Sequence, residues 1–538
     1  MNNIRKAEGR LPFRSSTNHN GGSMFARFSL AGLLSLCLMF VSTVSGQAGE
    51  GGGVLRVGGP WWPKTLDIQK SGYVFKRLGV VDNIVEVDEG IRIVPGLAES
   101  WTVSPDKMTW SFSIRDGVLF HDGTPLTAGI LKENLDRLAR VGTLLKDVPL
   151  ASVQAPDDRT LVLTTTEPFA PLPAYLTMGE TGALAPSSFD ESGEVVRPVG
   201  TGPFVFESWK VKEEVTLTRN DRYWGDKAHV DTVVFRAVPD AVTRLAMLKA
   251  GEIDIAQILP PQAIASLESS GKYDILRMPI GRCRMACFNL NKEPFSDHRV
   301  REAVNLAVNR ADLVKYVLEG VGESAITLYP PQIYWANTTL PAFQHDPDRA
   351  AALLSEAGWI DKDGGRIRKK NGEPLKIKLV TYTERAALPP TAEIMQAQLA
   401  AVGFDVEIVA TQLDAAEAMR FKGDFDMYLM GRGLLFVPDP DYVLMTDYFS
   451  SNTEKQGWGA YHYENPEVDA LILAGRSEFD QAARKRIYDR VQAILLKDQP
   501  MVYLNYYVNV DAVAKKVRGY RMHPTESSYH LETVSLSR

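Results

Sequence analysis

The segment from residue 375 to residue 430 constrains the fold more than any other part of the chain. Apolar residues alternate with lysines from Leu375 to Leu379, as in a half-buried strand. An apolar-striped helix follows, which Pro390 begins and Gly403 ends, and a second alternating segment runs from Phe404 to Ile408. A strand, a helix and a strand joined by such a short turn form a parallel crossover unit, so the segment predicts an α/β fold.

Other segments also predict regular structure. In residues 108–127, aromatic and aliphatic side chains alternate with serines, and two Asp-Gly pairs mark turns, which predicts an antiparallel hairpin. A helix is expected over residues 127–138 and a short strand over residues 161–163.

Two further helices have clear boundaries. Asp346 is suited to cap a helix that starts at Pro347 and ends at Gly358. Another helix is predicted over residues 297–318, because its valines and an alanine fall on one stripe.

The length and composition predict several connected lobes. The chain has 538 residues, of which 45% are hydrophobic and 23% are charged, and this is ordinary globular composition. The usual domain size allows about three compact lobes. We find no internal repeat and no long linker, so these lobes should be closely connected.

The first 48 residues predict an export signal. Basic residues precede an apolar run from Phe28 to Val44, which is short for a membrane span and is followed by small residues up to Ala48. We therefore expect residues 1–48 to be a signal peptide that is removed on export. A shorter start at Met24 would give a more compact signal, and a retained anchor helix is the alternative.

The charge that remains after removal of the signal argues against a nucleic-acid partner. Without residues 1–48 the chain keeps 55 basic and 65 acidic side chains, a formal charge of about −10.

Two cysteines, Cys283 and Cys287, also remain. Four residues apart on an extended strand, their Cα atoms would be roughly 13 Å apart, so we expect buried thiols and no disulfide or metal role.

Several ordered motifs resemble one known family, the peptide- and nickel-binding solute receptors of ABC importers, which form solute-binding protein family 5. The likeness covers nearly everything after residue 54. The motifs are Ile93–Trp101, Ser113–Val118, Phe120–Pro125, Gly200–Phe204, Arg219–Gly225, Phe288–Asn289, Val308–Arg310 and Asp346–Trp359.

The resemblance implies a two-lobed periplasmic-binding-protein fold of type II, with an extra domain inserted in the first lobe. Lobe I would take residues 49–95, 196–292 and 500–538, the inserted domain residues 96–195, and lobe II residues 293–499. The chain crossings near residues 292 and 500 would be the hinge. The resemblance also implies a periplasmic monomer without a cofactor, which delivers its ligand to a membrane-embedded permease that cytoplasmic ATPases drive.

Ligand-binding residues are expected where strands end, because open sheets with parallel crossovers bind ligands at the carboxyl ends of their strands. Tyr382 and Glu384 follow the first strand of the crossover unit, and Arg432 follows a strand predicted over residues 425–430. Arg432 could clamp a ligand carboxylate in bidentate fashion. The alternative is a structural ion pair with Asp439 or Asp441.

Two further positions are candidates by the resemblance. Trp61 and Trp62 follow a first strand at residues 54–57, where related receptors contact the ligand. Peptide-binding relatives hold the ligand's amino terminus with an acidic residue after the Arg432 strand. Here that loop is apolar, so either Asp439 and Asp441 do this or the ligand lacks a free α-amine. The loop in which nickel-type relatives carry a histidine, residues 450–452, has none.

The sequence favours a binding protein over an enzyme. It has no G-x-S-x-G elbow, no P-loop, no full G-x-G-x-x-G and no histidine pair at zinc-binding helix spacing. We therefore expect a receptor that captures a small solute, with a short peptide as the first candidate. The alternatives are a nickel or metallophore chelate, an opine-like conjugate, an oligosaccharide and, from another class of protein, a secreted hydrolase.

Overall fold

The computed structural model describes residues 52–71, 73–361, 366–453 and 459–537, which belong to one compact unit, Gly49–Arg538. The predicted signal peptide lies outside the described residues. In the part that is described, no helix is long and apolar enough to cross a membrane.

A mixed sheet of 11 strands is the largest element of the described residues. The strand order is β17 (Asp405–Thr411), β16 (Lys376–Tyr382), β18 (Met427–Gly433), β12 (Tyr273–Phe288), β19 (Met501–Ala514), β11 (Ile255–Ala256), β1 (Val54–Gly59), β10 (Thr232–Ala237), β9 (Glu214–Arg219) and β8 (Phe204–Lys210), and β13 (Glu323–Ser324) pairs with β19 off this path.

The predicted crossover unit is confirmed. β16 and β17 are parallel neighbours, with Leu379 opposite Ile408, and helix α10 (Leu388–Ala401) connects them. Gly403 adopts a φ of 104°, a left-handed conformation that glycine takes without strain, and this lets the chain turn from the helix into β17.

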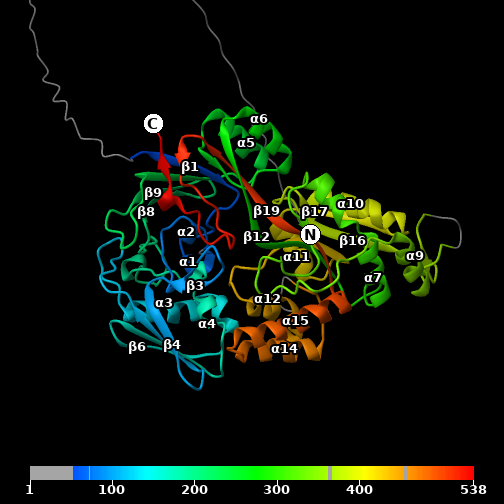
Figure 1. The fold of residues 1–538 in the computed structure, drawn as a ribbon, viewed down its shortest axis with the longest axis horizontal. Coiled ribbons are helices and arrows are strands. Elements are labelled where there is room, and N and C mark those ends of the chain that lie inside the picture. The colour runs from blue at the N-terminus through cyan, green and yellow to red at the C-terminus, as the bar shows by residue number, and fades with distance from the viewer. Residues whose placement is uncertain (1–51, 72, 362–365, 454–458, 538) are drawn as a thin grey trace, which may run out of the picture. The chain divides into compact units, whose positions relative to one another are not determined.

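Two long antiparallel strands, β12 and β19, connect the two groups of strands in the large sheet (Figure 1). The first half of β12 pairs with the second half of β19, which continues to β11 and β1. The second half of β12 pairs with β18 on its other side. The pairing between β12 and β19 is irregular between Pro279 and Cys283 and again at Arg284.

A separate antiparallel sheet has the order β4 (Ala98–Val103), β5 (Thr109–Ile114), β7 (Thr160–Thr165) and β6 (Leu150–Asp157), and helix α3 (Ala128–Val141) packs with it. The helix and both strands β5 and β7 were predicted. The predicted hairpin is wrong for β5, because β5 pairs with β4 before it and with β7, while residues 118–126 form a tight antiparallel turn of their own. Local turn signals did not reveal that a strand some 50 residues later competes for the same edge.

One of two predicted helices forms as expected, and the other is shorter than predicted. Helix α9 (Pro347–Glu356) forms as expected, and the Asp346 side chain accepts a hydrogen bond from the backbone of Arg349. The helix predicted over residues 297–318 is wrong in extent, because α7 (His298–Ala307) ends and Asn309 caps a new short helix, α8 (Arg310–Asp312). The break lets the Arg310 guanidinium reach the carbonyl oxygens of Asn305 and Tyr503.

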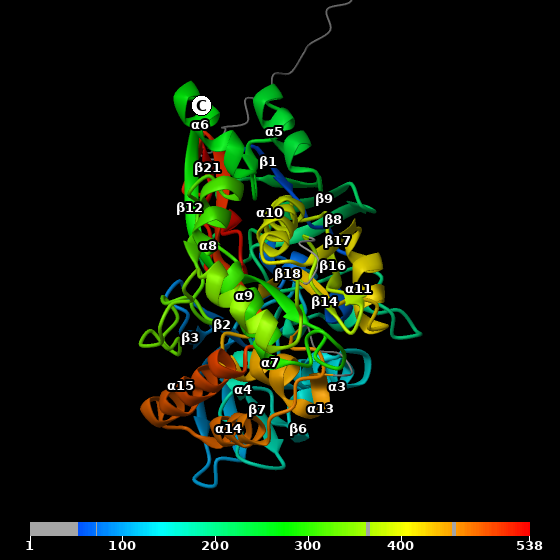
Figure 2. The same cartoon turned by 90° about the vertical axis from the view of Figure 1, so that its right-hand side faces the viewer.

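The remaining α-helices of more than four residues are α2 (Tyr73–Arg77), α5 (Ala241–Ala250), α6 (Ile264–Ser270), α11 (Leu413–Phe421), α12 (Pro440–Tyr448), α14 (Pro466–Ser477) and α15 (Gln481–Asp498), and a π-helix, Leu313–Val317, follows α8. Figures 1 and 2 both place α14 beside the segment of α4 (Leu172–Tyr175). Contacts confirm this, because Ala170 N donates to the Arg476 carbonyl oxygen at 2.8 Å and the rings of Trp110 and Phe479 stack.

The two cysteines lie on β12 and are fully buried, as predicted. Burial raises the pKa of Cys283 to about 12, so this thiol stays protonated at neutral pH and is a poor nucleophile.

Candidate ligand-binding site

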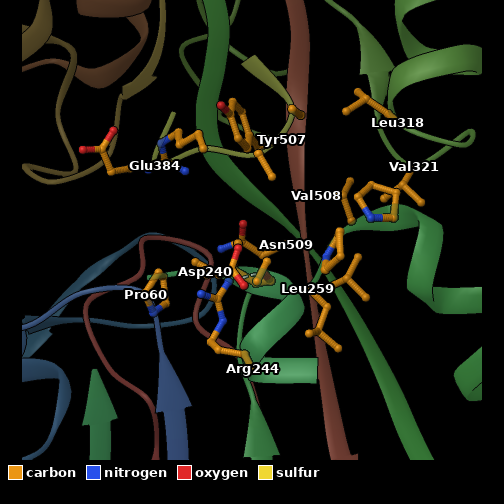
Figure 3. Close-up of a pocket in the computed structure, with 18 of the residues that line it drawn as sticks. Pro60, Asp240, Arg244, Leu259, Leu318, Val321, Glu384, Tyr507, Val508 and Asn509 are labelled. Carbon is orange, nitrogen blue, oxygen red and sulfur yellow. Dashed lines mark hydrogen bonds between the residues drawn. The ribbon is translucent and has the colours of Figure 1, made fainter. Parts of the chain in front are cut away.

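A pocket of about 180 Å³ lies where β12 and β19 connect the two groups of strands (Figure 3). Four loops that follow the carboxyl ends of β1, β10, β11 and β16 contribute to its wall. Strand β12 contributes Arg284, and β19 contributes Asn505 and residues 507–510. Figure 3 shows Glu384 and Tyr507 on one side of the pocket and Pro60, Asp240 and Arg244 on the other. The pocket therefore lies at the strand ends where a ligand is expected in such sheets.

Glu384 is a predicted site residue that lines the pocket. Its Oε1 accepts a hydrogen bond from the backbone N–H of Leu413 at 2.8 Å, which positions the carboxylate. Its Oε2 is buried and has no hydrogen-bond partner in the described residues. A buried carboxylate oxygen without a donor is unfavourable, so this atom is suited to accept an N–H from a ligand.

Trp61 also lines the pocket, and the neighbouring guanidinium of Arg385 contacts it. The Arg385 guanidinium carbon lies 5.2 Å from the Trp61 ring and 5.4 Å from the Tyr507 ring. Burial lowers the pKa of Arg385, but Tyr507, Tyr382 and Glu526 together raise it above the usual value, so the side chain is charged. Two aromatic rings therefore hold a charged donor at the pocket wall.

Arg284 approaches Tyr507 from β12. Its guanidinium carbon lies 4.4 Å from the centre of the Tyr507 ring, and its Nη1 donates to Asn505 Oδ1 at 2.7 Å. The Nε of Arg284 is buried without an acceptor, and so is the Tyr507 hydroxyl. Arg284, Arg385 and Tyr507 were not among the predicted ligand residues, and only the position of Arg385 next to Glu384, at a strand end, pointed to one of them.

A neighbouring buried ion pair supports the base of the site. Arg282 Nη2 lies 2.6 Å from Glu526 Oε2, and Asn509 Nδ2 donates to the other oxygen of Glu526 at 3.3 Å. Burial raises the pKa of Glu526, but Arg282, Arg77 and Arg385 outweigh it and lower the pKa to about 2. Glu526 is therefore ionised, and Arg282 already has its carboxylate.

Arg244 lines the pocket, but its guanidinium donors are used in hydrogen bonds within the protein. Its guanidinium donates to four backbone carbonyl oxygens, those of Val238, Pro239, Gln257 and Ile258. Burial lowers its pKa to about 10. Arg244 thus joins the loops after β10 and β11, and these loops form one wall of the pocket.

Two other predicted residues lie outside the pocket lining. Tyr382 is buried, and its hydroxyl accepts a hydrogen bond from the backbone of Gly431 at 3.1 Å. Trp62 is partly buried.

Arg432 lies within β18, which extends to Gly433, three residues beyond the predicted strand end. Its Nε donates to Asp447 Oδ2 at 2.7 Å, and its Nη2 to Asp447 Oδ1 at 2.9 Å. Arg432 is 5% exposed and Asp447 is fully buried. The structural ion pair considered for Arg432 is therefore present, but its partner is Asp447 and not Asp439 or Asp441.

Asp439 and Asp441 are buried at the start of α12. Asp439 caps the helix and accepts a hydrogen bond from Arg484 Nη2 at 2.8 Å. Asp441 accepts a hydrogen bond from the Tyr175 hydroxyl at 2.9 Å and lies 3.1 Å from Arg476 Nε. Neither is in the pocket lining.

A buried acid beside the pocket makes stability depend on pH. Asp511 accepts hydrogen bonds from Ile258 N at 2.8 Å and from the Tyr520 hydroxyl at 2.7 Å, and burial raises its pKa to about 6. Because the folded-state pKa lies above the ordinary value, the contribution of Asp511 to stability is complete below pH ~4 and is lost as the pH rises through about 6.

We expect Asp511→Asn to raise the free energy of unfolding at pH 8 by about 2 kcal/mol and to reduce its decline between pH 4 and 8. Asp441, whose pKa burial also raises to about 6, remains in the variant, so part of the decline should persist. Chemical denaturation at several pH values measures this. Parallel curves for both proteins over the whole range would show that Asp511 does not titrate as described.

The fold and the pocket together define a class of protein, a receptor that holds a small solute between loops of one sheet. The chain belongs to the bacterial extracellular solute-binding proteins, family 5, whose model matches residues 92–455. It is 30% identical over 470 residues to the nickel-binding periplasmic protein of Escherichia coli K12, covering 85% of this chain and 89% of that protein. It is 28% identical to the E. coli K12 glutathione-binding protein GsiB, covering 84% and 87%.

Solved structures agree with this assignment. The oligopeptide-binding protein AppA from Bacillus subtilis, in complex with a nonapeptide, has a TM-score of 0.79 at 25% identity, covering 91% of this chain and 100% of AppA. NikA from Brucella suis, in complex with Fe(III)-EDTA, has a TM-score of 0.80 at 27% identity, covering 90% and 100%. The predicted α/β, two-lobed periplasmic-binding-protein fold is thus confirmed.

Proposed function

We propose that this protein is the periplasmic solute receptor of an ABC importer and binds its solute in the pocket between β12, β19 and the loop after β16. The observation that carries the proposal is the pocket itself, because loops from both groups of strands meet there around unpaired polar atoms. In this function the protein does not chemically change the solute. It passes the solute to a membrane permease that cytoplasmic ATPases drive, and it acts as a monomer.

In this proposal lobe I comprises residues 49–95, 196–292 and 500–538, the inserted domain residues 96–195, and lobe II residues 293–499. The sheet topology supports the division, because residues 98–165 include their own four-stranded sheet, and in the large sheet β12 pairs with β18 of one group while β19 pairs with β11 of the other. The irregular pairing of β12 with β19 near Pro279–Arg284 is suited to absorb a hinge rotation. Ligand binding would then favour the closed state in proportion to its extra contacts there.

The first candidate ligand is a short peptide, and the second is a metal chelate. Solved relatives bind one or the other, namely a nonapeptide in AppA and Fe(III)-EDTA in NikA of Brucella suis. Opine-like conjugates are a further candidate, since a protein 25% identical to this chain, AgaA, binds agropinic acid.

A thermal-shift screen tests this function. Short peptides, glutathione, nickel-histidine, an opine and maltotriose are each added to the purified protein, and mass spectrometry identifies any small molecule that co-purifies. We expect at least one solute to raise the melting temperature in a concentration-dependent way and to be recovered unchanged. If no solute does so and none co-purifies, or if the solute is converted, the proposal fails.

A further inference from the structure

Two charged guanidinium groups in the pocket have no carboxylate partner. In the described part of the chain, neither Arg284 nor Arg385 forms an ion pair. Arg284 is only 3% exposed, and its Nε has no acceptor. Leaving the buried charge of Arg284 without a counter-charge costs free energy. Arg385 is half-buried, and its nearest acidic influence, Glu526, lies beyond ion-pair distance and is already paired with Arg282.

Elsewhere the fold supplies such partners. Four buried arginines outside the pocket each have a carboxylate: Arg137 has Asp67, Arg432 has Asp447, Arg476 has Asp441 and Arg484 has Asp439. Arg77 is an exception, because it lies over the rings of Tyr73 and Tyr529 and its Nε has no acceptor in the described residues. Arg282, next to the pocket, has Glu526. Arg244 and Arg310 instead bind backbone carbonyl oxygens. Arg284 and Arg385 therefore differ from the paired and carbonyl-bound arginines at the place where a ligand would enter.

The ring of Tyr507 contacts both guanidinium groups. Both lie over the Tyr507 ring, at 4.4 Å for Arg284 and 5.4 Å for Arg385, and Trp61 lies next to Arg385. Aromatic contacts fix the plane of a guanidinium group without using its N–H donors. Arg284 Nη1 donates to Asn505, and the remaining donors of the group are available for bonds that a carboxylate accepts.

Among the described residues, the acidic groups of the pocket form no ion pair with these two arginines. Asp240 accepts two hydrogen bonds from Thr243 at 2.7 Å each and caps α5. Glu384 is held by Leu413 through one oxygen and leaves only its Oε2 free. The loop after β18 carries Phe436, whose ring lies 5.3 Å from the Arg282 guanidinium, and its one acid, Asp439, is outside the pocket lining and pairs with Arg484. The pocket therefore offers two cationic donor groups and one anionic acceptor atom.

We propose that the solute is a small organic acid with at least two carboxylate groups and one N–H donor. Arg284 binds one carboxylate, Arg385 binds another, and Glu384 Oε2 accepts the N–H. This rests on the proposed function and narrows its ligand class to acidic peptides, opine-like amino acid conjugates or carboxylate chelates. Neutral peptides and oligosaccharides lack the charge that the two arginines need.

Isothermal titration calorimetry with defined probes tests the inference. The dicarboxylate probes are glutamylglutamate and N-(carboxymethyl)glutamate, each with and without Ni²⁺, which separates a free acid from a chelate. The neutral probes are glutaminylglutaminamide, trialanine and maltotriose. The variants are Arg284→Met and Arg385→Met, and the matched control is Arg92→Met, whose exposed side chain pairs with Asp88 far along the chain from the pocket residues.

We expect a dicarboxylate probe to bind the wild type, and each pocket variant to bind it at least about tenfold more weakly, while Arg92→Met binds normally. Without ligand, the pocket variants should melt no earlier than the wild type, because each removes a buried charge that has no partner. A residue that serves only the fold would lower this melting temperature.

Three outcomes overturn the inference. One is that neither dicarboxylate binds, another is that a neutral probe binds wild type and both pocket variants equally, and the third is that the variants lose stability along with affinity. Tight binding of a neutral solute would leave the receptor function intact while it refutes this ligand class. Failure of every solute in the thermal-shift screen would instead refute the receptor function.

Discussion

Replacing Arg432 by alanine is expected to lower the free energy of unfolding by about 3–5 kcal/mol. The substitution leaves the carboxylate of Asp447 fully buried without its two guanidinium hydrogen bonds. Thr446 Oγ1 also donates to Asp447 at 2.7 Å, but one hydroxyl does not replace a counter-charge. Urea denaturation followed by circular dichroism measures the loss.

The matched control is Arg92→Ala, which removes an ion pair with Asp88 in which the arginine side chain is 80% exposed. Solvent screens such a pair, so we expect a change below about 1 kcal/mol. The affinity of the folded Arg432 variant for its solute should be unchanged. A variant of normal stability that no longer binds carboxylate solutes would instead restore Arg432 as a ligand residue and contradict the structure described here.

Replacing Gly200 by alanine is expected to destabilise the protein by about 3 kcal/mol. An added Cβ would lie 2.1 Å from the carbonyl oxygen of Val80, a backbone atom that cannot rotate away. The next residue, Thr201, is fully buried and donates to Asp82 Oδ2, and the indole N–H of Trp224 donates to the same oxygen. Two of the motifs that carried the family resemblance thus meet at one acid, where a backbone shift would disturb both.

Gly129→Ala is the control for this substitution. Gly129 lies in α3, and the nearest atom to an added Cβ is 3.5 Å away, so we expect a stability gain of about 0.5–1 kcal/mol. Thermal melting of the two variants should therefore shift in opposite directions. Equal and small shifts would mean that the close approach between Gly200 and Val80 is absent in solution.

The sequence predicted those elements whose causes are local. The helix α9 depends on a contact between residues close together in the chain, the cap that Asp346 forms with the backbone of Arg349. The crossover of β16, α10 and β17 depends on the left-handed conformation of a single residue, Gly403. The partner of β5 and the end of α7 depend on residues that are distant in sequence or on a side chain that reaches another strand. No local pattern contains this information.

The sequence predicted the location of the site better than it predicted the side chains that form it. The rule that ligands bind at strand ends led to Glu384, and the family resemblance led to Trp61; both line the pocket. It did not reveal that Arg432 faces Asp447, because this depends on which side of β18 packs against α12. Arg284 and Tyr507 could not be paired in advance, since they lie on β12 and β19 and meet only through the register of two strands more than 200 residues apart.

Small-angle X-ray scattering tests the central claim most directly, namely that the protein closes around a solute. The radius of gyration is measured without ligand and with a saturating concentration of the solute that raises the melting temperature. We expect it to decrease on addition of the solute and to stay constant with a solute that does not bind. An unchanged radius of gyration at saturation, with the binding confirmed in the same sample, would contradict closure of the two lobes on the ligand.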